Sequence, residues 1–178
     1  MRTTLIALAL AAALPLSAQA AERSYTFVEG TYNNIDADGI DRIDGFGLRG
    51  SVAFADTGFY GLGSYQNYSE NGADADLWEL GLGYAHGLAD NVDLITEAAY
   101  ADAEGESGYR VSTGLRGSLT SNLEGLAKVS YRDYSNVNGD FTGTFGLQYR
   151  FDKTWGVTGE IEFDDSARIY TVGVRASF

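Results

Sequence analysis

The sequence contains no cysteine, one proline and one histidine. Without cysteine the chain has no disulfide bonds and no thiolate metal sites, and a single histidine, His86, excludes a multi-histidine metal site within one chain. After Leu16 no run of eighteen apolar residues occurs, so we expect no transmembrane helix. Basic residues are also scarce, with 12 Lys and Arg against 25 Asp and Glu. This acidity argues against nucleic acid as a partner.

The first twenty residues have the pattern of a cleaved secretory signal peptide. Arg2 is followed by an uncharged stretch, 5–16, and by Ala18 and Ala20 as small residues before the expected cleavage site. An N-terminal membrane anchor fits less well, because a spanning helix needs about twenty apolar residues. We therefore expect removal of residues 1–20, which leaves one domain, 21–178, with a net charge of −14 once Arg2 is lost.

Apolar and polar residues alternate through most of the remaining chain. Trp78 and Leu80, for example, alternate with Glu79 and Gly81, so a strand here would have one apolar and one polar face. Most of the alternating segments have the nine to eleven residues that a tilted membrane strand needs. Ten segments alternate in this way: 24–33, 44–55, 59–67, 77–86, 92–101, 108–119, 123–133, 141–151, 155–163 and 168–178.

The connections between these segments alternate in length, as short periplasmic turns and longer outer loops do in membrane barrels. An even number of strands places both termini on the periplasmic side. We predict an all-β fold: a closed, antiparallel, up-and-down transmembrane β-barrel of ten strands, with eight strands as the alternative. The expected short connections are 56–58, 87–91, 120–122 and 152–154, and the longer ones are 34–43, 68–76, 102–107 and 134–140, with 164–167 a short exception on the outer side.

Aromatic residues distinguish a membrane barrel from a soluble β-sandwich, whose strands also alternate. In the apolar phase they lie at both ends of the strands, where membrane barrels carry two aromatic girdles. The expected outer girdle is Tyr32, Trp78, Tyr100, Tyr109, Tyr131, Phe141, Phe163 and Tyr170. The expected periplasmic girdle is Phe54, Tyr60, Tyr84, Tyr149, Phe151, Trp155 and Phe178.

Charges in the opposite phase balance although the whole chain is acidic. Enclosed charges need partners because an unpaired one loses its hydration without compensation. We therefore predict an ion-pair network in a largely plugged lumen, with Glu29–Arg49, Arg116–Glu124 and Glu97–Arg110 as neighbouring pairs. Its acids are Glu29, Glu79, Asp93, Glu97, Glu124, Glu160 and Glu162, and its bases are Arg49, Arg110, Arg116, Lys128, Arg132, Arg150 and Arg175.

The last segment ends on an aromatic residue preceded by apolar residues at alternate positions. This pattern resembles the C-terminal signature that the barrel-assembly machinery reads in outer-membrane proteins, so we expect that machinery and periplasmic chaperones as partners during biogenesis. The residues of the signature are Tyr170, Val172, Val174, Ala176 and Phe178.

Several short stretches resemble a known family. They are the end of the leader, 18–22, the stretch 25–31 (YTFVEGT), the run 47–52 (GLRGSV) and 172–175 (VGVR). They resemble the xanthomonad family of small outer-membrane proteins once proposed as secreted activators of plant immunity. More broadly, the chain is similar to OmpX-like and OmpA-like outer-membrane barrels. The resemblance implies a location in the outer membrane and its vesicles, and roles in motility, biofilm and virulence.

An outer-membrane hydrolase is the enzymatic alternative. It would need a histidine inside the outer rim, near a nucleophile or an acid. His86 falls in the outward phase at the periplasmic end of segment 77–86. We expect a histidine at the lipid interface, no catalytic residue and no cofactor.

Acidic residues also crowd the expected outer loops. Most such charges keep loops solvated, and weak Ca²⁺ or Mg²⁺ bridging to lipopolysaccharide phosphates is the functional alternative. The weak metal candidates are Asp36, Asp38, Asp74, Asp76, Asp164 and Asp165.

The function expected from these features is structural and interactive, since the lumen is plugged and the acidic loops face outward. A narrow channel for ions or small solutes is the alternative, because inward glycines such as Gly47 and Gly81 leave some space. An open diffusion porin is excluded, because it needs about sixteen strands.

Overall fold

The computed structural model describes residues 23–37, 43–70, 73–135 and 137–178. The expected signal peptide, 1–20, lies outside the described residues, as does Asp38. Within the described part of the chain, no helix has the length and hydrophobicity to cross a membrane.

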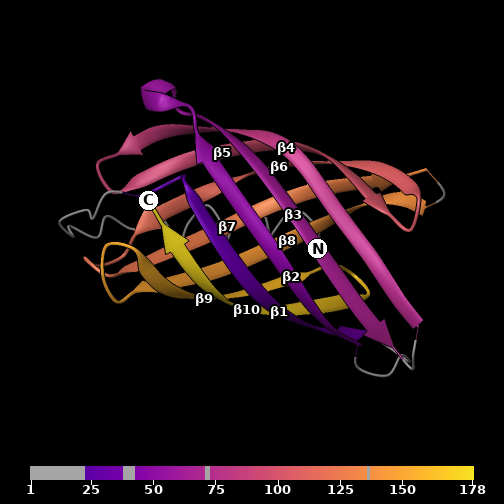
Figure 1. Ribbon diagram of the computed structural model, residues 1–178. Helices are drawn as coiled ribbons and strands as arrows, with labels where there is room; N and C mark the ends of the chain where they lie inside the picture. The colour runs from indigo at the N-terminus through magenta and orange to yellow at the C-terminus, as the bar shows by residue number, and fades with distance from the viewer. Residues whose placement is uncertain (1–22, 38–42, 71–72, 136) are drawn as a thin grey trace.

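Ten strands form one closed sheet (Figure 1). Each strand pairs antiparallel with its sequence neighbours, and β1 closes the barrel by pairing with β10. The prediction of a closed, ten-stranded, up-and-down barrel is confirmed. The strands are β1 (Phe27–Ala37), β2 (Ile43–Ala53), β3 (Phe59–Glu70), β4 (Ala73–Ala89), β5 (Val92–Ala103), β6 (Glu106–Ser118), β7 (Leu123–Tyr134), β8 (Val137–Arg150), β9 (Trp155–Phe163) and β10 (Ala167–Ser177).

The barrel wall is apolar outside and polar inside. Phe46 and Leu80 keep 70% and 65% of their surface exposed on the outer face, whereas Glu29 on the inner face is fully buried. Among the described residues, fifteen buried side chains are polar or charged and only four are apolar. A soluble domain has the reverse distribution, because its apolar side chains avoid water. The alternation therefore gives the surface of a transmembrane barrel, whose outer face is solvated by lipid.

Both described ends of the chain lie at the same end of the barrel, which we call the terminal end. Ser24 Oγ donates a hydrogen bond of 2.7 Å to the Phe178 carbonyl. The short 3-10 helix η1 (Ala55–Thr57) lies at this end too, above the C-terminus in Figure 1. Gly58 ends η1 with φ 79°, a left-handed conformation that glycine adopts without steric cost.

The prediction of long loops at the opposite end is wrong where the structure describes them; residues 38–42 of the expected loop 34–43 lie outside the described residues. Most of 68–76 and 102–107 continues the strands, and β5 and β6 meet at Glu104 and Gly105. These two residues have φ 54° and 84°, the positive values of a two-residue hairpin turn. A strand outside the apolar belt faces water on both sides and needs no alternation, which explains why its polar sequence suggested loops.

Tyr60 is a second correction. The sequence placed it in the outward girdle, but its side chain is only 3% exposed and points into the lumen, whereas the adjacent Phe59 is 52% exposed outside. Tyr60 lies inside because the lumen offers its hydroxyl a hydrogen-bond acceptor, Glu97.

Candidate functional site: the charged lumen

One group of lumen charges surrounds Glu29 on the wall formed by β9, β10, β1 and β2. Register places Glu29 opposite both Arg49 and Arg175. Arg49 donates two hydrogen bonds of 2.9 Å to Glu29 and also reaches Glu160 at 2.7 Å. Arg175 lies 2.6 Å from Glu29, and Thr158 also donates to this carboxylate. We call Glu29, Arg49, Glu160 and Arg175 the Glu29 cluster; its charges sum to zero.

A glycine makes room for this cluster. A Cβ added at Gly173 would strike the Glu29 carboxylate and lie 2.6 Å from Thr158 Oγ1. The close approach of Glu29 to the β10 backbone therefore requires glycine at this position.

A second group of charges lies on the opposite wall, formed by β4, β5, β6 and β7. Arg110 Nη2 lies 2.7 Å from Glu79, and Lys128 Nζ lies 3.0 Å from Glu97. Arg110 also reaches Glu97 at 3.4 Å. Tyr60 donates a hydrogen bond of 3.0 Å to Glu97. We call Glu79, Glu97, Arg110 and Lys128 the Glu97 cluster; it too is neutral.

Two smaller groups complete the network. Glu124 pairs with Arg116 at 2.8 Å and with Arg150 at 3.3 Å. Glu162 pairs with Arg132 at 2.8 Å. The structure thus brings every proposed network residue into at least one ion pair, including the neighbouring pairs Glu29–Arg49, Arg116–Glu124 and Glu97–Arg110.

Several of these pairs skip a strand. Arg110 on β6 reaches Glu79 on β4, and Lys128 on β7 reaches Glu97 on β5. The register of paired strands does not predict these partners, because it relates only residues on adjacent strands. In a narrow barrel the wall curves inward, so long side chains from strands that are not adjacent meet inside it.

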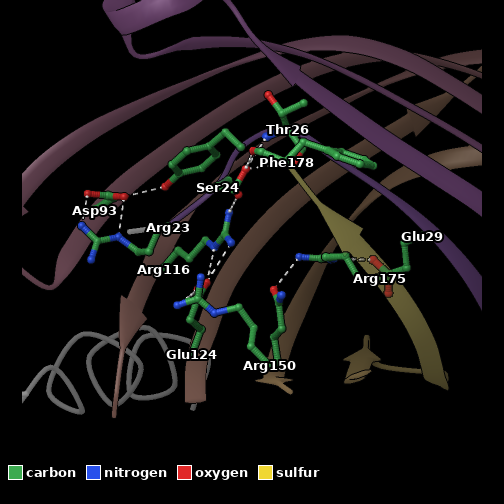
Figure 2. Close-up of polar contacts among 12 residues, drawn as sticks. Arg23, Ser24, Thr26, Glu29, Asp93, Arg116, Glu124, Arg150, Arg175 and Phe178 are labelled. Atoms are coloured by element: carbon green, nitrogen blue, oxygen red, sulfur yellow. Dashed lines mark hydrogen bonds and ion pairs between the residues drawn. The ribbon is translucent and has the colours of Figure 1, made fainter. Parts of the chain in front are cut away.

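The residues before β1 form part of the lumen, which the sequence did not suggest. We call Arg23, Ser24, Tyr25 and Thr26 the N-terminal strap. Figure 2 shows Arg23 beside Asp93 and Arg116 reaching Ser24. The expected first segment, 24–33, treated 24–26 as strand, whereas β1 begins at Phe27; Arg23 lay outside that segment.

A cavity of about 240 Å³ remains between the two charged walls. Side chains from both clusters line it, as do Tyr25 and Tyr60 at the terminal end. The paired side chains hold one another within each wall, and the space between the two walls suits water molecules. The Glu29 and Glu97 clusters are each compensated internally, whereas Glu124 is one carboxylate between two arginines, Arg116 and Arg150.

The other candidate residues do not join into a reactive site. His86 is exposed on the outer face, with its ring stacked 6.4 Å from that of Tyr84. Asp76 accepts hydrogen bonds from Tyr65 and Asn67, and Asp164 accepts from two backbone amides of its own turn. Across the described residues, no three His, Asp or Glu side chains gather where they could hold a metal ion. The structure therefore does not bring together Asp36, Asp76, Asp164 and Asp165 of the metal set, and the side chain of Asp74, like Asp38, lies outside what the structure describes.

The residues of the C-terminal signature lie where alternation predicts. Tyr170, Val172 and Val174 are exposed on the outer face of β10, and Phe178 is 75% exposed at the terminal end. The Phe178 amide donates a hydrogen bond of 2.9 Å to the Thr26 carbonyl.

Comparison with known proteins shows the fold and no closer relationship. No family model matches the sequence, and no curated protein matches it. Among solved structures, a KdgM porin in complex with disordered oligogalacturonate matches with TM-score 0.55 and 13% identity, over 85% of this chain and 99% of that one. Another KdgM porin structure gives TM-score 0.52 and 18% identity, over 84% and 99%.

The translocator domain of the autotransporter NalP from Neisseria meningitidis is a third match. It gives TM-score 0.50 and 10% identity, over 99% of this chain and 96% of that domain. The resemblance to the xanthomonad family stays a prediction. What the matches establish is that this chain has the fold of outer-membrane β-barrel proteins.

Proposed function

We propose that the chain is an outer-membrane barrel protein with a closed lumen, whose role is structural and interactive: it presents its acidic opposite end to the outside for adhesion, biofilm formation or virulence. The observation that carries this proposal is the complete pairing of the lumen charges. A solute pathway would need charges free to exchange partners with water, whereas here each arginine is held by a carboxylate from another strand.

The location rests on the combination of an apolar outer face, a C-terminal signature and an expected signal peptide over residues 1–20. In this proposal the terminal end faces the periplasm, and lipopolysaccharide surrounds the opposite end, with Ca²⁺ or Mg²⁺ as weak bridges. Delivery to vesicles would follow from an outer-membrane location.

A second candidate is a narrow channel for ions or small solutes. The cavity of about 240 Å³ favours it, because this space extends between both charged walls. An outer-membrane hydrolase has less support, since His86 lies outside the barrel.

Conductance in planar lipid bilayers separates the first two candidates. A closed lumen predicts little current through refolded wild-type barrels. Steady, sizeable openings of the wild type would contradict the closed lumen and favour the channel.

The surface role needs a separate test in cells. Neutralising Asp76, Asp164 and Asp165 at the opposite end should change adhesion to a surface, whereas Asp152→Asn at the terminal end should not. Equal adhesion of the two strains, at equal barrel levels in the membrane, would contradict the surface role.

The assembly partners can be tested through the last residue. Deleting Phe178 should lower the folded, heat-modifiable barrel in outer membranes while refolding into detergent persists. Unchanged membrane levels would contradict recognition of the C-terminal signature by the assembly machinery.

A further inference from the structure

The N-terminal strap crosses the terminal end of the lumen from one wall to the other. On the near side, Thr26 Oγ1 accepts a hydrogen bond of 3.0 Å from the Ala53 amide, and the Thr26 carbonyl binds the Phe178 amide. On the far side, Arg23 reaches β5. Figure 2 shows this span, with Phe178 beside Thr26 and Asp93 at the other extreme.

Asp93 holds the far end of the strap. Arg23 Nε and Nη2 each donate to its carboxylate at 2.8 Å, and the Tyr25 hydroxyl donates at 2.7 Å. Burial raises the pKa of the Tyr25 hydroxyl above its usual value, so this group stays protonated and remains a donor. Charge-assisted bonds of this fork geometry are the strong ones among protein hydrogen bonds.

The middle of the strap rests on lumen side chains. Arg116 Nη1 donates a hydrogen bond of 2.9 Å to the Ser24 carbonyl, and its guanidinium lies 4.8 Å from the Tyr25 ring centroid. The Tyr25 ring stacks on Tyr60 at 5.0 Å. Because Tyr25 and Tyr60 both line the central cavity, the strap forms part of the floor of that cavity.

The strap can leave without breaking the pairing of the strands. Asp93 lies at the start of β5, whose pairing with β4 and β6 does not involve the strap. On the near wall, Ser24 Oγ donates to the Phe178 carbonyl and Ser51 Oγ donates to the Tyr25 carbonyl, both at 2.7 Å, and these two side-chain bonds break when the strap moves. The near attachment at Thr26 leads directly into β1 and acts as the pivot.

We propose that residues 23–26 form a displaceable strap that closes the terminal end of the lumen, with Asp93 as its catch. When Asp93 releases Arg23 and Tyr25, the strap swings out about Thr26 and joins the central cavity to the solvent at that end. This device is distinct from the surface role proposed above and from the ion pairs at mid-height, which stay in place when the strap moves.

A cysteine reporter measures access to the cavity. The chain has no cysteine, so Ser64→Cys introduces a single thiol. Ser64 lines the cavity and lies between Arg49 and Glu79 in the register of the sheet. In liposomes, a small anionic methanethiosulfonate should modify this thiol slowly in the otherwise wild-type barrel.

Two variants release the strap in different ways, in the Ser64→Cys background. Asp93→Asn removes the catch, and Arg23→Gln with Tyr25→Phe removes the groups that it holds. Each should raise the modification rate roughly tenfold or more, the response expected when charge-assisted bonds are lost. The matched control is Asp152→Asn, which removes the same charge from another turn at the terminal end, away from the strap, and keeps an oxygen for the Thr154 and Trp155 amides.

If the thiol of both variants is modified at the same rate as in the control, in folded and heat-modifiable barrels, the proposal of a displaceable strap is wrong. If Asp93→Asn does not fold, the double variant Arg23→Gln with Tyr25→Phe tests the proposal, because it changes no residue of the barrel wall. If neither folds, residues 23–26 are an obligatory part of the barrel and the proposal is wrong.

The same variants in planar bilayers keep this inference separate from the closed lumen. A silent wild type whose strap variants are modified no faster than the control would contradict the strap alone, because the mid-height ion pairs keep the lumen closed whether or not the strap moves. A conducting wild type whose current rises when the strap is released would contradict the closed lumen alone.

Discussion

The two neutral clusters of the lumen have the same charges and different surroundings. Each contains two carboxylates and two cationic groups. Glu29 is fully buried and held by two arginine forks, whereas the Glu97 side chain keeps 13% of its surface exposed and has a lysine among its partners. A fork is preorganised for two parallel bonds, whereas a lysine is a flexible point charge that can turn towards water. Glu29 is therefore the drier and more rigidly held of the two central carboxylates, beside the β1–β10 seam, and Glu97 has the softer contacts.

The difference between the two clusters can be tested by removing the central carboxylate of each in turn. Glu29→Gln leaves Arg175 without its carboxylate in a dry site and should destabilise the barrel by about 3–5 kcal/mol. Glu97→Gln should cost less, about 1–3 kcal/mol, because Arg110 keeps Glu79 and Lys128 can turn to cavity water. Urea unfolding in lipid vesicles measures both losses. Equal losses would mean that the two clusters are equally hydrated.

A double substitution sharpens the account of the Glu29 cluster. Glu29→Gln with Arg175→Gln removes one charge of each sign and leaves the Arg49–Glu160 pair, which is 2.7 Å apart. The double variant should be more stable than Glu29→Gln alone by at least about 1 kcal/mol, as expected for coupled partners. The same unfolding measurement, completed with Arg175→Gln, gives the coupling. Additive losses would show that the two residues act independently.

A smaller effect is expected from a single methyl group beside Glu29. Gly173→Ala places a Cβ against the carboxylate and should cost about 1–3 kcal/mol through overpacking. Gly159→Ala on the neighbouring strand is the matched control, since nothing lies within 4 Å of its added Cβ. It should change stability by no more than about 0.5 kcal/mol. If both variants unfold at the same urea concentration, the cluster is looser than its geometry implies.

The smallest effect concerns the softer cluster. Tyr60→Phe removes the hydroxyl that donates to Glu97 and keeps the ring that stacks on Tyr25. The loss should be about 1 kcal/mol, and it should vanish in the Glu97→Gln background. If Tyr60→Phe lowers the stability by the same amount in the Glu97→Gln background, the effect comes from ring packing and not from the hydrogen bond.

The alternation of single residues was sufficient to determine the fold of this chain and the direction of most side chains. It placed Phe46 and Leu80 outside and Glu29 inside, because the side-chain period of a strand is a local property of the backbone. It also gave the neighbouring pair Glu29–Arg49, since a hairpin register follows from the two strands and their connection.

Closure of the sheet decided the rest. The partners Arg49–Glu160 and Lys128–Glu97 come from strands that are not adjacent, and they meet only because the wall curves around a narrow lumen. The hairpins at the opposite end are longer than their polar sequence suggested, because strand pairing in water does not depend on an apolar face. Tyr60 and the strap residues Arg23 and Tyr25 point inward because the closed barrel offers Glu97 and Asp93 as buried acceptors. The period of a strand cannot encode such contacts, since they join strands that are not paired, with partners from 31 residues apart (Lys128–Glu97) to 111 residues apart (Arg49–Glu160).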